Sequence, residues 1–106
     1  MKRICQVIGV KSERCEEYIR LHENIWPHII KRLKERNITN YTIFNLDGML
    51  VQYFEYVGND FEADMNMPDD EIEQKWHALC ISMQESFSKE SNEIQWLDMK
   101  SVFHMN

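Results

Sequence analysis

The alternation of apolar and polar residues along the first third of the chain predicts a strand followed by helical segments. Residues 3–10 (RICQVIGV) are rich in β-branched and apolar side chains and stop at a polar run, which is typical of a strand. Over residues 13–23, apolar and aromatic residues recur at the spacing of one helix face. Pro27 would clash inside a helix, so it either kinks this helix or begins a second helix over 27–36.

The middle of the chain carries the pattern of a β-hairpin. Residues 40–46 and 49–56 alternate between apolar and polar positions, and an Asp-Gly pair separates them. Asp-Gly is a strong signal for a two-residue turn, because both of its residues adopt positive φ angles readily. Alternation along the first of these strands places Tyr41 on the same face as Ile43 and Asn45.

The second half of the chain predicts two further helices and a closing strand. A short helix is expected around residues 60–67, and Pro68 then opens a longer helix. Residues 88–93 (SKESNE) are polar and predict a loop, and residues 100–105 (KSVFHM) predict the last strand. The apolar face of the longer helix consists of Ile72, Trp76, Leu79, Cys80, Met83 and Phe87.

These elements follow one another in the order β-α-β-β-α-β. This order is that of the ferredoxin-like α+β fold, in which helices cover one face of an antiparallel sheet. The length of 106 residues is typical of a single domain, which we expect to span residues 1–106. The opposite face of the sheet also carries apolar side chains and has no helices to cover it, so we expect a second copy of the sheet to pack there. The expected assembly is therefore a homodimer of the α+β barrel type, formed through the sheet face.

The net charge and the lengths of the apolar runs restrict the classes of partner. With 12 basic and 18 acidic residues the net charge is −6, whereas a nucleic-acid-binding protein would carry a basic surface. The most basic run, KRLKER at 31–36, lies on a predicted helix with acidic residues upstream. The apolar runs are far shorter than a membrane span, and the first residues turn polar too early for an export signal. We therefore expect neither nucleic-acid nor membrane partners, and a cytoplasmic location.

Tyr18 and His22 interrupt the apolar face of the first predicted helix. They are four residues apart, so their side chains lie one above the other on the same side of the helix. A histidine in such a position is often a core residue with a satisfied hydrogen bond, and this alternative stays open for His22. The neighbouring tyrosine, however, and the Trp76-His77 pair on the later helix favour a functional site. Histidine exchanges protons near neutral pH, which makes His22 the candidate acid–base residue.

The other candidates have ordinary structural explanations when each is taken alone. Trp76 fits the core, His77 fits the boundary of its helix face, and Tyr41 fits strand packing. His22 and His28 are six residues apart and lie on different faces of a helix, so they are not expected to share a metal. The sequence contains neither a glycine-rich phosphate loop nor clustered cysteine and histidine spacing, so no metal site is expected.

Several segments together resemble the L-rhamnose mutarotase family. They are EEYIRLHENIWPHI, NITNYTIF, QKWHAL and SVFHM, and they keep the family's order over almost the whole chain. The resemblance implies a dimeric ferredoxin-like fold and a cofactor-free interconversion of the α and β anomers of a 6-deoxy sugar, with L-rhamnose and L-fucose as candidates. Opening a cyclic hemiacetal needs one proton added to the ring oxygen and another removed from the anomeric hydroxyl, which fits positioned acid–base side chains.

The same resemblance implies roles for particular residues. His22 corresponds to the proton donor, and Tyr18 and Tyr41 correspond to substrate contacts. In the family, two adjacent tryptophans on the second long helix complete the sugar site, and here the matching positions hold Trp76 and His77. The histidine departs from the family pattern and leaves the preferred sugar open.

Two other functions are compatible with the sequence. Cofactor-poor oxygenases occur on dimeric α+β barrels, and an enzyme of that class would need a larger, more apolar pocket and molecular oxygen. A non-catalytic sugar-binding module would bind a sugar without speeding anomer exchange. A mutarotase, in contrast, requires polar groups that converge near His22.

Overall fold

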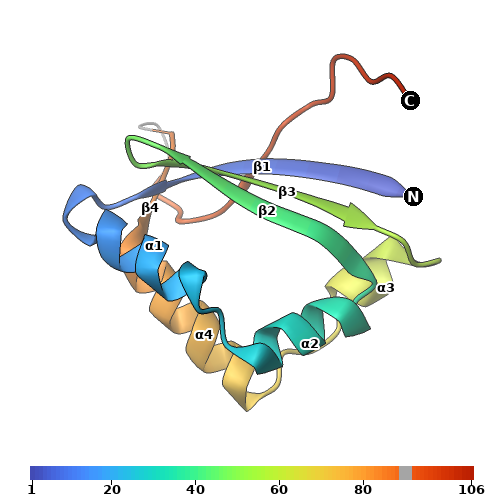
Figure 1. The fold of residues 1–106 in the computed structure, drawn as a ribbon, viewed down its shortest axis with the longest axis horizontal. Coiled ribbons are helices and arrows are strands. Elements are labelled where there is room, and N and C mark those ends of the chain that lie inside the picture. The colour runs from blue at the N-terminus through green and yellow to red at the C-terminus, as the bar shows by residue number, and fades with distance from the viewer. Residues whose placement is uncertain (89–91) are drawn as a thin grey trace.

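The computed structural model describes residues 1–88 and 92–106 (Figure 1). Residues 89–91 of the predicted loop at 88–93 lie outside this description. The elements, in chain order, are β1 (Lys2–Val10), a short 3₁₀ helix η1 (Ser12–Arg14), α1 (Cys15–Glu23), α2 (Pro27–Glu35), β2 (Ile38–Leu46), β3 (Met49–Tyr56), α3 (Phe61–Met65), α4 (Glu71–Met83), β4 (Gln84–Glu85) and β5 (Leu97–Asp98).

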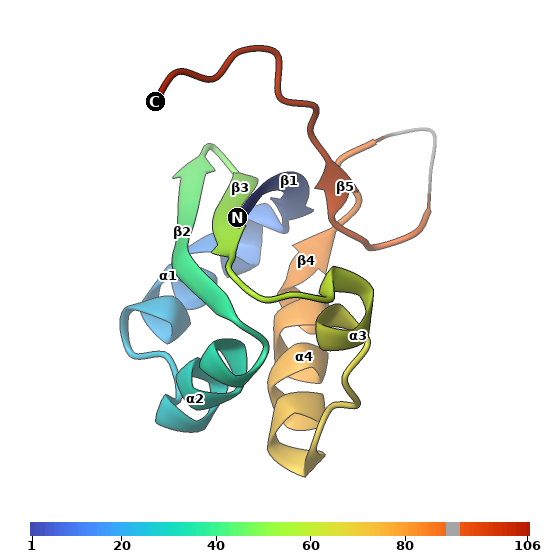
Figure 2. The same ribbon diagram turned by 90° about the vertical axis from the view of Figure 1, so that its right-hand side faces the viewer.

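The strands form an antiparallel sheet in the order β2-β3-β1-β4, and β5 also pairs with β1. β1 and β3 pair along their length, from Lys2 opposite Tyr56 to Gly9 opposite Met49. β4 and β5 are short pieces on the other edge of β1. α1, α2 and α4 lie against one face of this sheet (Figures 1 and 2). The predicted α+β class with an antiparallel sheet is therefore confirmed.

The Asp-Gly turn joins β2 to β3 as predicted. Asp47 and Gly48 have φ angles of 49° and 87°, the positive values that a tight hairpin between twisted strands requires. The turn fixes the register of β3 so that alternate residues face the helices, beginning with the buried Leu50. Gln52, a polar residue, takes one of these inward positions and is buried.

Pro27 begins α2 and does not kink α1. Trp26 precedes it in an extended conformation, and Pro27 occupies the first helical turn, where its missing N–H costs no hydrogen bond. The chain changes direction between α1 and α2 (Figure 1). Trp26, at this break, packs toward α4, where its ring centroid lies 5.0 Å from that of Trp76.

α4 begins with a capping box and ends earlier than predicted. The Asp70 side chain accepts the Glu73 N–H, and the Glu73 side chain accepts the Asp70 N–H. The apolar face was expected to continue to Phe87, but the helix stops at Met83, so this part of the prediction was wrong. Gln84 turns extended and pairs with β1 instead, because the free edge of that strand offers backbone hydrogen bonds where the helix would have continued.

The predicted closing strand at 100–105 was wrong. Strand pairing ends near Met99, whose N–H donates to the Cys5 carbonyl at 2.8 Å. The following residues have no regular structure and run away from the sheet (Figures 1 and 2). Val102 and Phe103 are 91% and 80% exposed. Within one chain, a strand here would bury too little apolar surface to offset the entropy of ordering it.

The hydrophobic core lies between the sheet and the longer helices, and it includes the fully buried Ile8, Leu50 and Met83. On the opposite face of the sheet, Phe44 and Leu46 are 61% and 65% exposed. Helices thus cover one sheet face, while the outer face keeps apolar side chains in solvent. Within the described part of the chain, no helix combines the length and apolar character that a membrane crossing requires.

Candidate active site

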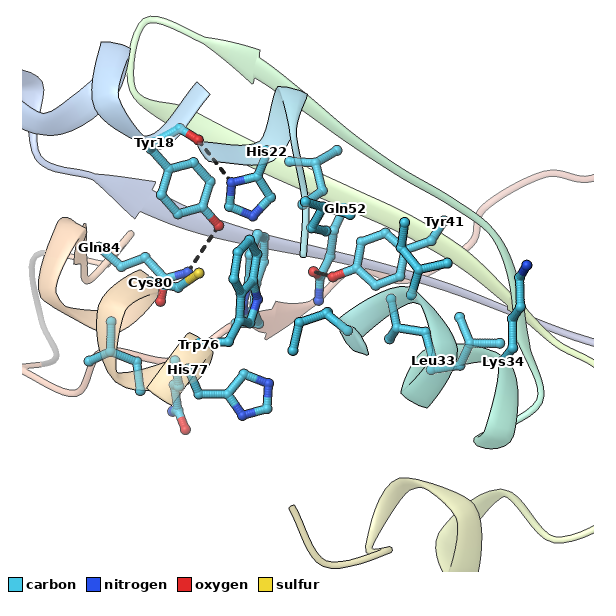
Figure 3. A pocket seen from close by; sticks show the side chains of 18 of the residues that line it. Tyr18, His22, Leu33, Lys34, Tyr41, Gln52, Trp76, His77, Cys80 and Gln84 are labelled. Atoms are coloured by element: carbon cyan, nitrogen blue, oxygen red, sulfur yellow. Dashed lines mark hydrogen bonds between the residues drawn. The ribbon is translucent and has the colours of Figure 1, made fainter. Parts of the chain in front are cut away.

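A cavity of about 920 Å³ opens between the sheet and the helices, a size in the range of small-molecule sites. It is lined by residues of α1, α2, β2, β3, α4 and β4, and by the segment 94–96 that precedes β5. Figure 3 shows many of these side chains and the way they converge. All the site residues predicted from the sequence lie on this cavity: Tyr18, His22, Tyr41, Trp76 and His77.

His22 presents one ring nitrogen to the cavity. Its position one helical turn after Tyr18 stacks the two rings, with centroids 4.2 Å apart and planes at 22°. Nδ1 of His22 lies 2.8 Å from the Tyr18 carbonyl oxygen. Because a carbonyl can only accept, Nδ1 carries a hydrogen and Nε2 of the neutral ring holds a lone pair. Among the described residues Nε2 has no hydrogen-bond partner, so it is available to a ligand.

Burial governs the charge state of His22. It lowers the pKa of the ring, and the hydrogen bond to the Tyr18 carbonyl offsets only part of this effect. The neutral form is therefore favoured at neutral pH. When the ring does take a proton, the resulting imidazolium gives it up more readily than that of an ordinary histidine. Both properties suit a residue that passes a proton to and from a ligand.

Trp76 lies between His22 and Trp26. Its ring centroid is 5.2 Å from that of His22, with planes at 62°, and 5.0 Å from that of Trp26, with planes at 68°. These edge-to-face contacts fix the orientation of the indole. Only 5% of Trp76 is exposed, so the residue belongs to the core and at the same time offers flat apolar surface to the cavity.

The Tyr18 hydroxyl is hydrogen-bonded to Gln84, the residue that follows the last turn of α4. Nε2 of Gln84 donates to it at 3.2 Å. Burial raises the pKa of Tyr18 to about 12, although the hydrogen bond from Gln84 lowers it in part. The phenol therefore stays protonated at physiological pH and keeps its own hydrogen free to donate to a ligand.

Tyr41 approaches the cavity from β2 and belongs to a row of hydrogen bonds across the sheet. Its hydroxyl donates to Oε1 of Gln52. Nε2 of Gln52 donates to Oε1 of Gln6 at 2.6 Å, and Nε2 of Gln6 donates to Oδ1 of Asp98 at 2.8 Å. The Tyr41 ring stacks on Phe54, with centroids 5.4 Å apart, and burial raises the pKa of the Tyr41 phenol. The row and the stacked ring together hold this hydroxyl at the cavity.

His77 lines the cavity next to Trp76 (Figure 3). Its side chain is 52% exposed, and its Nδ1 lies 2.8 Å from Oδ2 of Asp69. His28 pairs in a similar way with Asp70, but it does not line the cavity. Within the described ranges, histidine, cysteine and carboxylate side chains do not gather in threes as a metal site would need.

Sequence reasoning did not single out Gln52, Gln84 and Trp96, which also line the cavity. Gln52 carried a usable signal, because it is a polar residue at an inward position of an alternating strand. Gln84 carried no such signal, since the apolar pattern continued the helix through it. Trp96 follows residues without periodicity, and its place depends on the pairing of β5 with β1.

The fold and the cavity together define an α+β protein in which an imidazole with a free nitrogen, two phenols and an indole surround a space for a small polar molecule. The chain belongs to the L-rhamnose mutarotase family, whose model matches residues 3–105. The L-rhamnose mutarotase of Oceanobacillus iheyensis is 33% identical over 107 residues, which cover 100% of both chains. That of Bacillus subtilis is 32% identical over 109 residues, again with 100% of both chains covered. The family membership expected from the sequence motifs is therefore confirmed.

Solved structures share the fold. An L-rhamnose mutarotase from Formosa agariphila has a TM-score of 0.79 and 18% sequence identity, with 100% of both chains covered. Tetracenomycin F2 cyclase from Streptomyces glaucescens, a type-II polyketide cyclase, has a TM-score of 0.64 and 10% identity, again over 100% of both chains. At these identities the likeness concerns the arrangement of helices and strands.

Proposed function

We propose that this chain interconverts the α and β anomers of a 6-deoxy sugar, with L-rhamnose as the substrate and L-fucose as a second candidate. The observation that carries the proposal is Nε2 of His22, which faces a cavity shared with Tyr18 and Trp76 and is free of hydrogen bonds to the described residues. Membership of the L-rhamnose mutarotase family, and full-length relatives of that name, support the sugar and the reaction. The proposed unit is one domain over residues 1–106, acting in the cytoplasm.

The proposed reaction uses the imidazolium form of His22, which burial makes the minor form at neutral pH. Nε2 gives its proton to the ring oxygen while the bond between that oxygen and the anomeric carbon breaks, and the electron pair of the bond goes to the oxygen. The anomeric hydroxyl loses its proton to an acceptor such as water and becomes the carbonyl oxygen. Rotation about the adjacent carbon–carbon bond exposes the other carbonyl face, and the reverse proton transfers close the ring as the other anomer. Every group returns to its starting state, so no cofactor enters the proposal.

The aromatic residues hold the sugar during this exchange. The indole of Trp76 offers a flat surface to the C–H face of the pyranose, and Tyr18 donates its hydroxyl hydrogen to a sugar oxygen. Tyr41 holds a second sugar hydroxyl from the sheet, and His77 contacts the sugar from α4. These few polar groups orient the ligand, while the apolar lining of the cavity shields the C–H surface of the sugar from water.

The wild-type protein is expected to exchange the anomers of L-rhamnose faster than they exchange spontaneously. A positioned acid–base group contributes on the order of 10²–10⁴-fold in rate, which is ample to detect. One-dimensional saturation-transfer NMR with L-rhamnose and L-fucose side by side measures both activity and preference. Sugar binding without faster exchange would identify a binding module, and oxygen consumption with an aromatic substrate would identify an oxygenase. Either result would contradict the proposal.

We also propose that a second copy of the chain covers the outer face of the sheet. Phe44 and Leu46 on that face are largely exposed, and so are Val102 and Phe103 in the C-terminal segment. Covering such apolar side chains removes them from water, which favours association. In this proposal two chains together form the ferredoxin-like dimer of the α+β barrel type.

A Phe44→Lys, Leu46→Lys double variant is expected to be monomeric at concentrations where the wild-type protein is a dimer. Closing the interface would bury two unpaired ammonium groups from each chain, which is strongly unfavourable. Sedimentation equilibrium measures the assembly. Ile72→Lys is the matched control, since it alters an exposed apolar residue on α4 and should leave the dimer intact. A wild-type protein that sediments as a monomer would show that the proposed assembly is wrong.

A further inference from the structure

Asp69 connects His77 to a buried guanidinium. Oδ2 of the Asp69 carboxylate lies 2.8 Å from Nδ1 of His77, and Oδ1 accepts from Nη2 of Arg36 at 3.0 Å. Arg36 is only 7% exposed, and its Nη1 donates to the carbonyl oxygens of Asp64 and Met67 at 3.0 and 2.7 Å. The carboxylate is thus anchored by a side chain that is itself fixed in the interior, and it holds the His77 ring in turn.

The Asp69 carboxylate also determines which ring nitrogen of His77 remains available to a ligand in the cavity. An ionised carboxylate only accepts hydrogen bonds, so Nδ1 of His77 carries a hydrogen. In the neutral ring the lone pair is then on Nε2. Within the described part of the chain Nε2 has no hydrogen-bond partner, and His77 lines the same cavity as His22. Figure 3 shows these two imidazole rings at opposite ends of Trp76.

We propose that Asp69 is a positioning residue for His77, and that Nε2 of His77 accepts a hydrogen bond from a hydroxyl group of the bound sugar. The inference rests on the proposed function and deepens it, because it names the polar group that the sugar meets at the end of Trp76 away from His22. Asp69 touches no ligand and acts through the orientation and tautomer of His77. The consequence is selection among sugars, since an analogue that lacks the hydroxyl group facing Nε2 binds less tightly.

The test compares His77→Phe, Asp69→Asn and the double variant by their KM and kcat for anomer exchange of L-rhamnose. Phenylalanine keeps a flat ring without the nitrogen. Asparagine keeps the shape of the carboxylate, but its amide can donate to Nδ1 and so permits the tautomer in which Nε2 no longer accepts. Each single variant is expected to raise KM about tenfold, the equivalent of one lost hydrogen bond, with kcat changed by less than about twofold. The double variant is expected to match His77→Phe alone.

His28→Phe is the matched control, because His28 also pairs with an aspartate, Asp70, yet does not line the cavity. It should keep the wild-type KM. The inference is overturned if either single variant keeps the wild-type KM. It is also overturned if Asp69→Asn raises KM as much in the His77→Phe background as in the wild-type chain, since the aspartate would then act without His77. If the wild-type protein itself accelerates exchange of neither sugar, the proposed function fails and the inference falls with it.

Discussion

Replacing His22 with alanine should lower the catalysed rate of anomer exchange by about 10²–10⁴-fold and leave the protein folded. The change removes the nitrogen that is proposed to pass a proton to the ring oxygen, while the rest of the cavity can still bind the sugar. The Nδ1 hydrogen bond that is lost goes to a carbonyl of the same helix, so no hydrogen bond between elements is broken. Saturation-transfer NMR with L-rhamnose measures the exchange rate, and thermal unfolding checks the fold.

The control for this variant is His28→Ala, which removes a histidine outside the cavity. Its exchange rate is expected to equal that of the wild-type protein. A His22→Ala protein that exchanges anomers as fast as the wild type would show that His22 is not the acid.

Replacing Glu73 with alanine should lower the free energy of unfolding by about 3–5 kcal/mol. Glu73 is only 4% exposed, and its two oxygens accept from Nε of Arg32 at 2.6 Å and from Nη2 of Arg36 at 3.1 Å. Burial by itself would raise the pKa of Glu73, but hydrogen bonds from the Asp70 N–H and from both guanidinium groups hold it below its ordinary value. Without this carboxylate, two poorly solvated cations lose a counter-charge, and α4 loses its capping box.

Urea denaturation measures this loss, and Glu71→Ala provides the comparison. Glu71 lies in the same first turn of α4, but its side chain is 85% exposed and its ion pair with Lys75 spans 3.7 Å. A solvated pair of this kind contributes about 1 kcal/mol or less. Equal unfolding midpoints for the two variants would mean that the buried ion cluster does not stabilise the fold as described.

Elements that depend on local chemistry could be predicted from the sequence. The hairpin around the Asp-Gly turn follows from the backbone preferences of a few neighbouring residues. The preferences of Pro27 left two alternatives, a kink in the first helix or the start of a second one, and the structure shows the second. The two failures, at Phe87 and at 100–105, have a different origin. Pairing with the free edge of β1 involves residues distant in sequence. Gln84 and Glu85 pair there and end α4, whereas pairing stops near Met99 and leaves residues 100–105 without a partner strand among the described residues. A local pattern of apolar residues cannot report such pairing.

The same distinction between local and long-range information applies to the candidate site. The four-residue spacing of Tyr18 and His22 was enough to place them on one helix face, and the aromatic pair on α4 was visible as a motif. The hydrogen-bond partners of these side chains come from other elements, so the sequence alone could not supply them. Gln84, which holds the Tyr18 hydroxyl, and Asp69, which holds His77, became evident only with the packing of the helices on the sheet.

The row of hydrogen bonds that starts at Tyr41 has a single direction. Tyr41 donates to Gln52, which donates to Gln6, and the last donation is to the carboxylate of Asp98. Because an ionised carboxylate has no hydrogen to give back, the row cannot reverse, and the Tyr41 oxygen meets the cavity with lone pairs only. Tyr18, whose oxygen already accepts from a glutamine, meets it with a hydrogen. A molecule bound between the two phenols must therefore donate a hydrogen bond to Tyr41 and accept one from Tyr18. This requirement distinguishes two opposite orientations of a sugar, even though its hydroxyl groups are chemically alike.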